Sequence, residues 1–144
     1  MSRKTTAAAP GAEPCPCGGR AAGASYADCC GRYIDHWATR PAPDAEALMR
    51  SRYSAFVREN APYLLATWHA GTRPPALDFE PGVQWLGLQV RRHTPLGAMH
   101  AEVEFVARSR LHGRATRLHE RSRFVRENAA DGTVRWCYVD GTMI

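Results

Sequence analysis

The sequence predicts an α+β protein in which helices pack on one face of a curved antiparallel sheet, with a small cysteine module before them. Hydrophobic residues recur at helical spacing over residues 44–68, and the pattern changes to strand-like alternation from residue 83 onward. Short turn segments separate the alternating stretches, which is typical of strands linked by hairpins. Four of the five cysteines lie within residues 15–30, well before the helices.

The composition fits one folded domain with a small appendage. A chain of 144 residues with 44% hydrophobic residues can bury a core of about a hundred residues. The net charge of +5 permits a polyanionic partner such as nucleic acid but does not require one. No segment has the apolar run of a secretory signal or the about 18 apolar residues of a membrane span. We therefore expect a cytoplasmic protein, in which clustered cysteines favour a metal over disulfides.

The cysteine module spans residues 13–33 and follows a tail, residues 1–12, that we expect to be disordered. Its cysteines form a C-x-C pair and a C-C pair, with glycine and proline nearby to let the backbone turn. Four thiolates can complete a tetrahedral zinc site; the candidate ligands are Cys15, Cys17, Cys29 and Cys30. Because four sulfurs leave no open position, catalysis at such a metal is not expected. The alternatives are a redox pair or thiols without a shared role.

Two helices are predicted after the connector at residues 34–43. Asp44 is a good N-cap for the first, whose buried stripe runs to Phe56. Asn60 precedes a proline and can cap a second, short helix that carries Trp68 near its end. Residues 69–82 are rich in glycine, proline and threonine and indicate a long loop.

Four strands are predicted in the second half, over residues 83–90, 99–111, 115–127 and 133–140. In the first, alternation places Trp85 on the same face as Val83 and Gly87. In the third, it places Glu120 on one face with Leu118, Ser122 and Phe124, while His119 points to the other face.

Several segments resemble known families. The segment from Cys15 to Cys30 resembles the SEC-C zinc-binding motif, and residues 47–56, 63–69, 118–124 and 136–141 resemble the bacterial YchJ-type family. This resemblance implies a zinc knuckle attached to a cystatin-like, nuclear-transport-factor-2-like (NTF2-like) cone over residues 34–144, and it brings no established activity. The family usually has eight residues between the two cysteine pairs, whereas this chain has eleven.

The concave side of such a cone is a candidate pocket. The side chains that we expect to line it are Tyr53, Trp68, Trp85, Glu120 and Trp136. A carboxylate among apolar neighbours, as expected for Glu120, is either a pocket acid available as a general base or half of a buried ion pair. In the second case its partner would be Arg50 or Arg52.

The third predicted strand is rich in arginine. Arg117, Arg121 and Arg123 share one face and could form a cationic stripe for nucleic acid. Alternatively, acids on the neighbouring strand, Glu102 and Glu104, could face them in ordinary cross-strand pairs.

Two functions from different classes follow. The leading hypothesis is a non-catalytic zinc-binding adaptor whose cysteine knuckle docks a protein, by analogy of the translocation or chaperone type, or a nucleic acid. The alternative is a small-molecule binder or enzyme that uses the cone. Common catalytic motifs are absent from the sequence, which favours a non-enzyme without deciding the matter. The sequence does not determine the oligomeric state, although dimerisation through the open sheet face is compatible with the fold.

Overall fold

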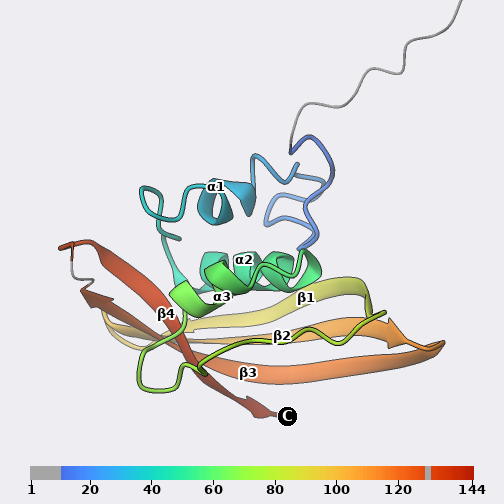
Figure 1. The fold of residues 1–144 in the computed structure, drawn as a ribbon. Helices are drawn as coiled ribbons and strands as arrows, with labels where there is room; N and C mark the ends of the chain where they lie inside the picture. Colours follow the sequence, from blue (N-terminus) through green and yellow to red (C-terminus); the bar gives the residue numbers. More distant parts are fainter. Residues whose placement is uncertain (1–10, 129–130) are drawn as a thin grey trace, which may run out of the picture.

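Four antiparallel strands form one sheet in the order in which they occur in the chain, and the helices cover one of its faces (Figure 1). The computed structural model describes residues 11–128 and 131–144, so most of the predicted tail and part of the last predicted turn lie outside the described residues. The strands are β1 Gln84–Pro95, β2 His100–Leu111, β3 Arg114–Asn128 and β4 Val134–Met143. The predicted α+β class is confirmed.

The two predicted helices begin at their predicted caps. The Asp44 side chain accepts a hydrogen bond of 2.8 Å from the backbone N–H of Ala47 and caps α2, Ala45–Val57. Asn60 caps α3, Ala61–Ala66, in the same way. One further short helix, α1 Gly31–Ile34, was not predicted, because a single turn carries too little periodicity to be recognised. No helix in the described part of the chain is long and apolar enough to cross a membrane.

The core lies between α2 and the concave face of the sheet. β2 follows strict alternation there, and its helix-facing side chains are all buried: Ala101, Val103, Phe105 and Ala107. Phe124 of β3 and Leu48 of α2 complete the centre of the same cluster. Burial of these side chains fixes which face of the sheet meets the helices.

A bulge in β1 changes which residues face the core. Leu86 is an extra residue in the pairing of β1 with β2, because the register shifts between Trp85 and Gly87. Beyond the bulge, Leu88 rather than Gly87 packs against the core, and Leu86 is 48% exposed. The predicted face was therefore correct for Trp85 and wrong for Gly87, since one inserted residue reverses the alternation.

The cysteine module forms a third layer on the outer side of α2 (Figure 1). Its cysteines and Tyr26 belong to the same buried cluster as the α2 residues Leu48 and Tyr53. The module is thus packed on the domain body over a shared apolar surface.

Candidate metal centre and candidate ligand cavity

The four cysteine sulfurs of the module lie within 4.8 Å of one another and are buried. The Sγ atoms of Cys15 and Cys17 are 3.6 Å apart, and those of Cys17 and Cys29 are 3.5 Å apart. Sulfurs at tetrahedral positions about 2.3 Å from a zinc ion are separated by about 3.8 Å. These four sulfurs could therefore hold a metal ion with little movement, despite the eleven-residue loop between the pairs.

The chemistry of the sulfur set also fits a cation. Burial and the nearby Cys17 raise the pKa of the Cys29 thiol to about 12. A divalent cation would supply the positive charge that stabilises clustered thiolates in such a buried place. The backbone N–H of Gly19 donates to the Cys17 sulfur at 3.2 Å, an outer contact that orients a sulfur ligand.

Polar contacts attach the module to α2. The Arg50 side chain donates to the backbone carbonyl of Cys17 at 3.2 Å, and the Cys15 sulfur lies 3.6 Å from the Ser54 hydroxyl. Just after α2, the Arg58 guanidinium lies 3.6 Å from the centre of the Tyr26 ring of the module. The sulfur cluster therefore faces the helix and not the solvent.

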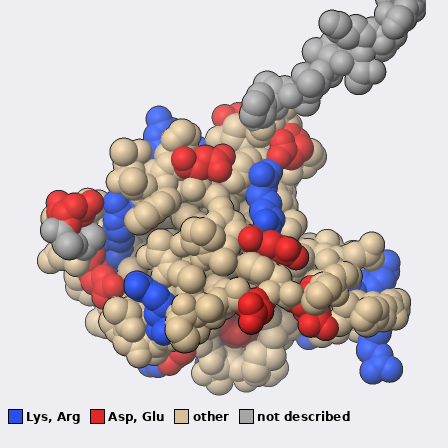
Figure 2. Space-filling model, in the orientation of Figure 1, with Lys and Arg blue, Asp and Glu red and all other residues tan. Residues whose placement is uncertain are grey.

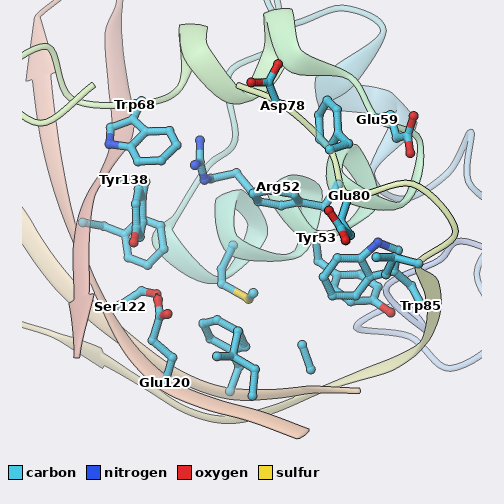
Figure 3. Close-up of a pocket in the computed structure, with 18 residues that line it drawn as sticks. Arg52, Tyr53, Glu59, Trp68, Asp78, Glu80, Trp85, Glu120, Ser122 and Tyr138 are labelled. Atoms are coloured by element: carbon cyan, nitrogen blue, oxygen red, sulfur yellow. The ribbon is translucent and has the colours of Figure 1, made fainter. Parts of the chain in front are cut away.

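A cavity of about 350 Å³ lies between α2, the loop before β1 and the sheet (Figure 3). Four of the five predicted pocket residues line it, namely Tyr53, Trp68, Trp85 and Glu120. Trp136 does not. It lines a separate hollow of about 20 Å³ together with Tyr33 and Trp37, and residues of the connector after α1 form the rest of that hollow.

Backbone pairing between the loop after α3 and β4 positions the Trp68 wall of the cavity. The N–H of Tyr138 donates to the carbonyl of Thr67 at 2.8 Å, and the N–H of His69 donates to the carbonyl of Tyr138 at 2.7 Å. The Trp68 and Tyr138 rings meet edge to face with their centres 5.1 Å apart. Trp68 is therefore held by backbone hydrogen bonds as well as by packing.

Glu120 projects from β3 into the cavity on its sheet side, next to Ser122 (Figure 3). The Ser122 hydroxyl donates to Glu120 Oε2 at 2.5 Å. No basic side chain of the described residues forms an ion pair with Glu120: Arg50 pairs with Glu46 at 2.9 Å, and Arg52 bonds neutral acceptors. The buried ion pair considered from the sequence is therefore wrong, and Glu120 is a cavity acid.

Arg52 is the one basic residue among the side chains that line the cavity. It is 5% exposed, and its Nη1 donates to the Leu64 carbonyl and to the Thr67 hydroxyl, both at 2.7 Å. Its guanidinium lies over the Trp68 and Tyr138 rings, 5.0 and 4.6 Å from their centres. Burial lowers the pKa of Arg52 to about 10, which leaves the side chain cationic at neutral pH.

Gly141 of β4 provides the space that the Glu120 carboxyl group occupies. A Cβ atom on Gly141 would overlap that carboxyl group and would lie 2.9 Å from Glu120 Cγ. The backbone of Gly141 does not have the positive φ that favours glycine. The absence of a side chain at this position therefore serves the close approach of Glu120.

Replacement of Gly141 by alanine is expected to lower the free energy of unfolding by about 1–3 kcal/mol, because the methyl group displaces the Glu120 carboxyl group. In a Glu120→Ala background the same substitution should cost less than about 0.5 kcal/mol. Urea unfolding of the four proteins in this double-mutant cycle measures the difference. Equal costs in both backgrounds would show that Gly141 is required for a reason other than Glu120.

Of the three arginines on the convex face of β3, Arg123 has an acidic partner among the described residues. Arg121 lies opposite Glu104 in the sheet, and Arg123 makes two hydrogen bonds of 2.6 and 2.5 Å to Asp140. On the side of the molecule drawn in Figure 2, blue basic groups are dispersed among red acidic groups and form no continuous patch. Arg123 is therefore paired with an acid of β4 and not with Glu102 or Glu104 of β2, whereas the Glu104 carboxylate is hydrogen-bonded to His119 Nε2 at 2.8 Å. Arg117 lies opposite Arg108 instead.

Sequence reasoning missed several cavity residues. The loop of residues 69–82 contributes Asp78, Phe79 and Glu80 to the lining, although its composition indicated only a connection. Arg52 was considered only as an ion-pair partner of Glu120, and the space that Gly141 leaves for Glu120 was missed, since both roles depend on partners far away in the chain. The signal that could have identified Gly141 is a glycine inside an alternating strand, which often marks a close approach.

Comparison with known proteins gives concordant results. Residues 44–141 match the family described as "YchJ, middle NTF2-like domain". The chain is 63% identical over 131 residues to a UPF0225 protein of Polaromonas sp. and 55% identical over 128 residues to one of Bordetella pertussis. These alignments cover 88% of this chain in both cases, and 91% and 90% of the relatives.

A solved structure is also similar over most of its length. It is the crystal structure of a SEC-C motif containing protein from Psychrobacter arcticus, with a TM-score of 0.77 and 32% sequence identity. The match covers 93% of this chain and 84% of that one. The predicted combination of an NTF2-like cone with an N-terminal cysteine cluster is thereby confirmed.

Proposed function

Because the chain belongs to the YchJ family of UPF0225 proteins, which combines an NTF2-like domain with a SEC-C type cysteine cluster, we propose that it binds a small molecule in the cavity of the cone. In this proposal the cysteine cluster holds zinc as a structural ion. The two parts have separate tasks: the metal stabilises the module on α2, and the cavity recognises the ligand.

The observation that carries the proposal is the cavity with Glu120 on its wall and no basic partner for that acid among the described residues. A volume of about 350 Å³ lies in the range of small-molecule sites, which begins at roughly 300 Å³. The lining is mostly apolar and aromatic, with its charged groups concentrated in one arginine and four carboxylates, so that it offers both packing surface and hydrogen-bonding groups to a ligand. A cone filled by aromatic residues, with Glu120 bound to arginine, would instead have supported a purely structural role.

The zinc assignment rests on the donor set. Four cysteines with no carboxylate or imidazole among them are typical of structural zinc, and their sulfur spacing fits its tetrahedral geometry. All four ligand positions would be filled by protein, so the ion would supply folding energy and no chemistry on a substrate.

The adaptor role of the cysteine module stays a prediction. Its sulfurs and Tyr26 are packed against α2, so the exposed residues 18, 20–23, 27 and 28 form the outer surface that is open to a partner. Residues 18–28 carry Arg20, but this side chain is already paired with Asp44 and Glu46. The cavity therefore has the stronger support as a binding site.

Titration of ¹⁵N-labelled protein with small aromatic probes tests the proposal. Three probes with one common body and different charge are suitable: 4-phenylbutanol, 4-phenylbutylamine and 4-phenylbutyrate. At least one probe is expected to shift the amide signals of β2, β3 and the loop of residues 69–82 in a saturable way. If none of the three does so, the proposal is wrong.

A matched pair of variants then locates the site. Leu118 lines the cavity from β3, so Leu118→Trp should fill the space and weaken binding about tenfold or more. Leu111 is also half-buried on a strand but does not line the cavity, so Leu111→Trp should bind as the wild type does. Equal affinity of both variants would place the probe elsewhere.

A further inference from the structure

The cavity is strongly acidic within a basic protein. Four carboxylates line it, and none of them forms an ion pair with a basic side chain of the described residues: Glu59, Asp78, Glu80 and Glu120. They share the lining with one arginine, whereas the whole chain has a net charge of +5. The charged groups that line the cavity therefore have a net negative charge, whereas the whole chain has a net positive charge.

The acids surround the cavity at two depths (Figure 3). Glu120 lies half-buried on the sheet side, and the exposed Glu59, Asp78 and Glu80 lie at the rim. In the view of Figure 2, several acidic groups lie close together near the middle of the surface. Three exposed acids at a mouth attract cations, and an unpaired acid further inside offers them a hydrogen-bonding partner.

Among the described residues, Arg52 forms no ion pair or hydrogen bond with the cavity acids, although its charge attracts Glu120 through space. Its Nη1 hydrogen bonds go to the Leu64 carbonyl and the Thr67 hydroxyl, and two aromatic rings lie beside its guanidinium. Contacts with neutral groups already hold this cation in place. Its hydrogen bonds therefore join α2 to α3, and the Glu120 carboxyl group, which accepts only from Ser122 among the described side chains, can still accept from a ligand.

Aromatic rings form much of the remaining wall. The Tyr53 and Trp85 rings meet edge to face 5.6 Å apart, and Phe56 and Phe79 meet in the same way at 6.1 Å. The faces of such rings carry a negative quadrupole that attracts organic cations, while the rings also bury apolar surface. Acids and rings therefore favour one and the same kind of ligand.

We propose that the ligand of this cavity is an organic cation: a protonated amine carried on an aromatic or branched aliphatic body small enough for about 350 Å³. The inference rests on the proposed function, which it makes more specific. The body packs among Tyr53, Phe56 and Trp85, and the ammonium group donates to Glu120. Anions of the same shape are repelled by the rim.

The three probes introduced above test the charge preference, because they differ only in the terminal group. At neutral pH the wild type should bind 4-phenylbutylamine about tenfold more tightly than 4-phenylbutanol, and 4-phenylbutyrate most weakly. Glu120→Gln should reduce the preference for amine over alcohol to about threefold or less, because the neutral amide lacks the charge that favours the ammonium group. The matched control is Glu102→Gln, an acid on the convex face of β2 that does not line the cavity; it should keep the full preference.

A second variant changes only the acids at the rim and so tests the charge preference without altering the interior of the cavity. Glu59, Asp78 and Glu80 are exposed, so their joint replacement by the corresponding amides should leave folding intact and lower the affinity for the amine severalfold, most clearly at low salt. Equal binding of amine and alcohol by the wild type, or tightest binding of the butyrate, would overturn the inference and leave the cavity as a ligand site. Failure of all three probes to bind would overturn the proposed function and the inference together.

Discussion

Cys29→Ser is expected to abolish binding of the proposed zinc ion and to cause the largest loss of stability among the substitutions considered. The hydroxyl group is a poor ligand for zinc beside three thiolates, so the metal content should fall from about one ion per chain toward zero. The cluster is buried and shares its packing with Leu48 and Tyr53 of the domain body. Its loss should therefore lower the free energy of unfolding of the whole chain by about 4 kcal/mol or more.

Elemental analysis of reduced protein and urea unfolding measure the two effects. Cys137→Ser is the matched control, because Cys137 is also buried but lies on β4 outside the sulfur cluster. Burial raises the pKa of Cys137 to about 12, so this thiol is neutral and packs as an apolar group. The control should retain its metal and lose about 1 kcal/mol. Freshly purified wild type without metal would contradict the metal site itself.

Arg52→Ala is expected to be the second most damaging change, at about 3–5 kcal/mol. The substitution leaves the Leu64 carbonyl without its charged donor, removes a bond to Thr67 and opens a void beside the Trp68 and Tyr138 rings. Hydrogen bonds to charged groups contribute about 1.5–3 kcal/mol each, and the cost of burying the charge offsets part of that sum. Loss of this junction should loosen α3 against β4.

Urea unfolding of Arg52→Ala beside Arg108→Ala checks this expectation. Arg108 is exposed on the sheet and lies opposite another arginine, so its truncation should change stability by less than about 0.5 kcal/mol. A third variant, Arg52→Met, replaces the aliphatic part of the side chain and should lose less than the alanine variant, because it fills part of the void. An alanine variant within about 1 kcal/mol of wild type would show that the buried cation is not structural.

Local patterns were sufficient for the elements of the fold. Asp44 and Asn60 cap α2 and α3 where N-cap chemistry predicted them, and the alternation of β2 named its buried face correctly. These features were accessible because each depends on residues within a few positions of one another. The bulge at Leu86 was not accessible, since it depends on how β1 pairs with β2.

For the cavity as well, the sequence predicted what depends on neighbouring residues and missed what depends on contacts between distant elements. Alternation placed Glu120, Ser122 and Phe124 on the inner face of β3, and all three line the cavity. Whether Glu120 has a basic partner depends on where α2 lies over the sheet, which no local pattern contains. Trp136 was expected to line the pocket, and it lies two residues before Tyr138 on β4, yet it lines another hollow near the beginning of the strand. Alternation determines a face but not a position along it.

The sequence by itself determined the α+β class, the helix caps, the inner face of β2 and the grouping of four cysteines. These follow from propensities and periodicities that act over a few residues. Only the tertiary structure decided that the cysteine module packs on α2, that Arg52 bonds α3, and that Glu120 stands unpaired in the cavity against Gly141. The reason is physical: hydrogen bonds and close packing act over a few ångströms, and the groups that they join here are far apart in the chain until it folds.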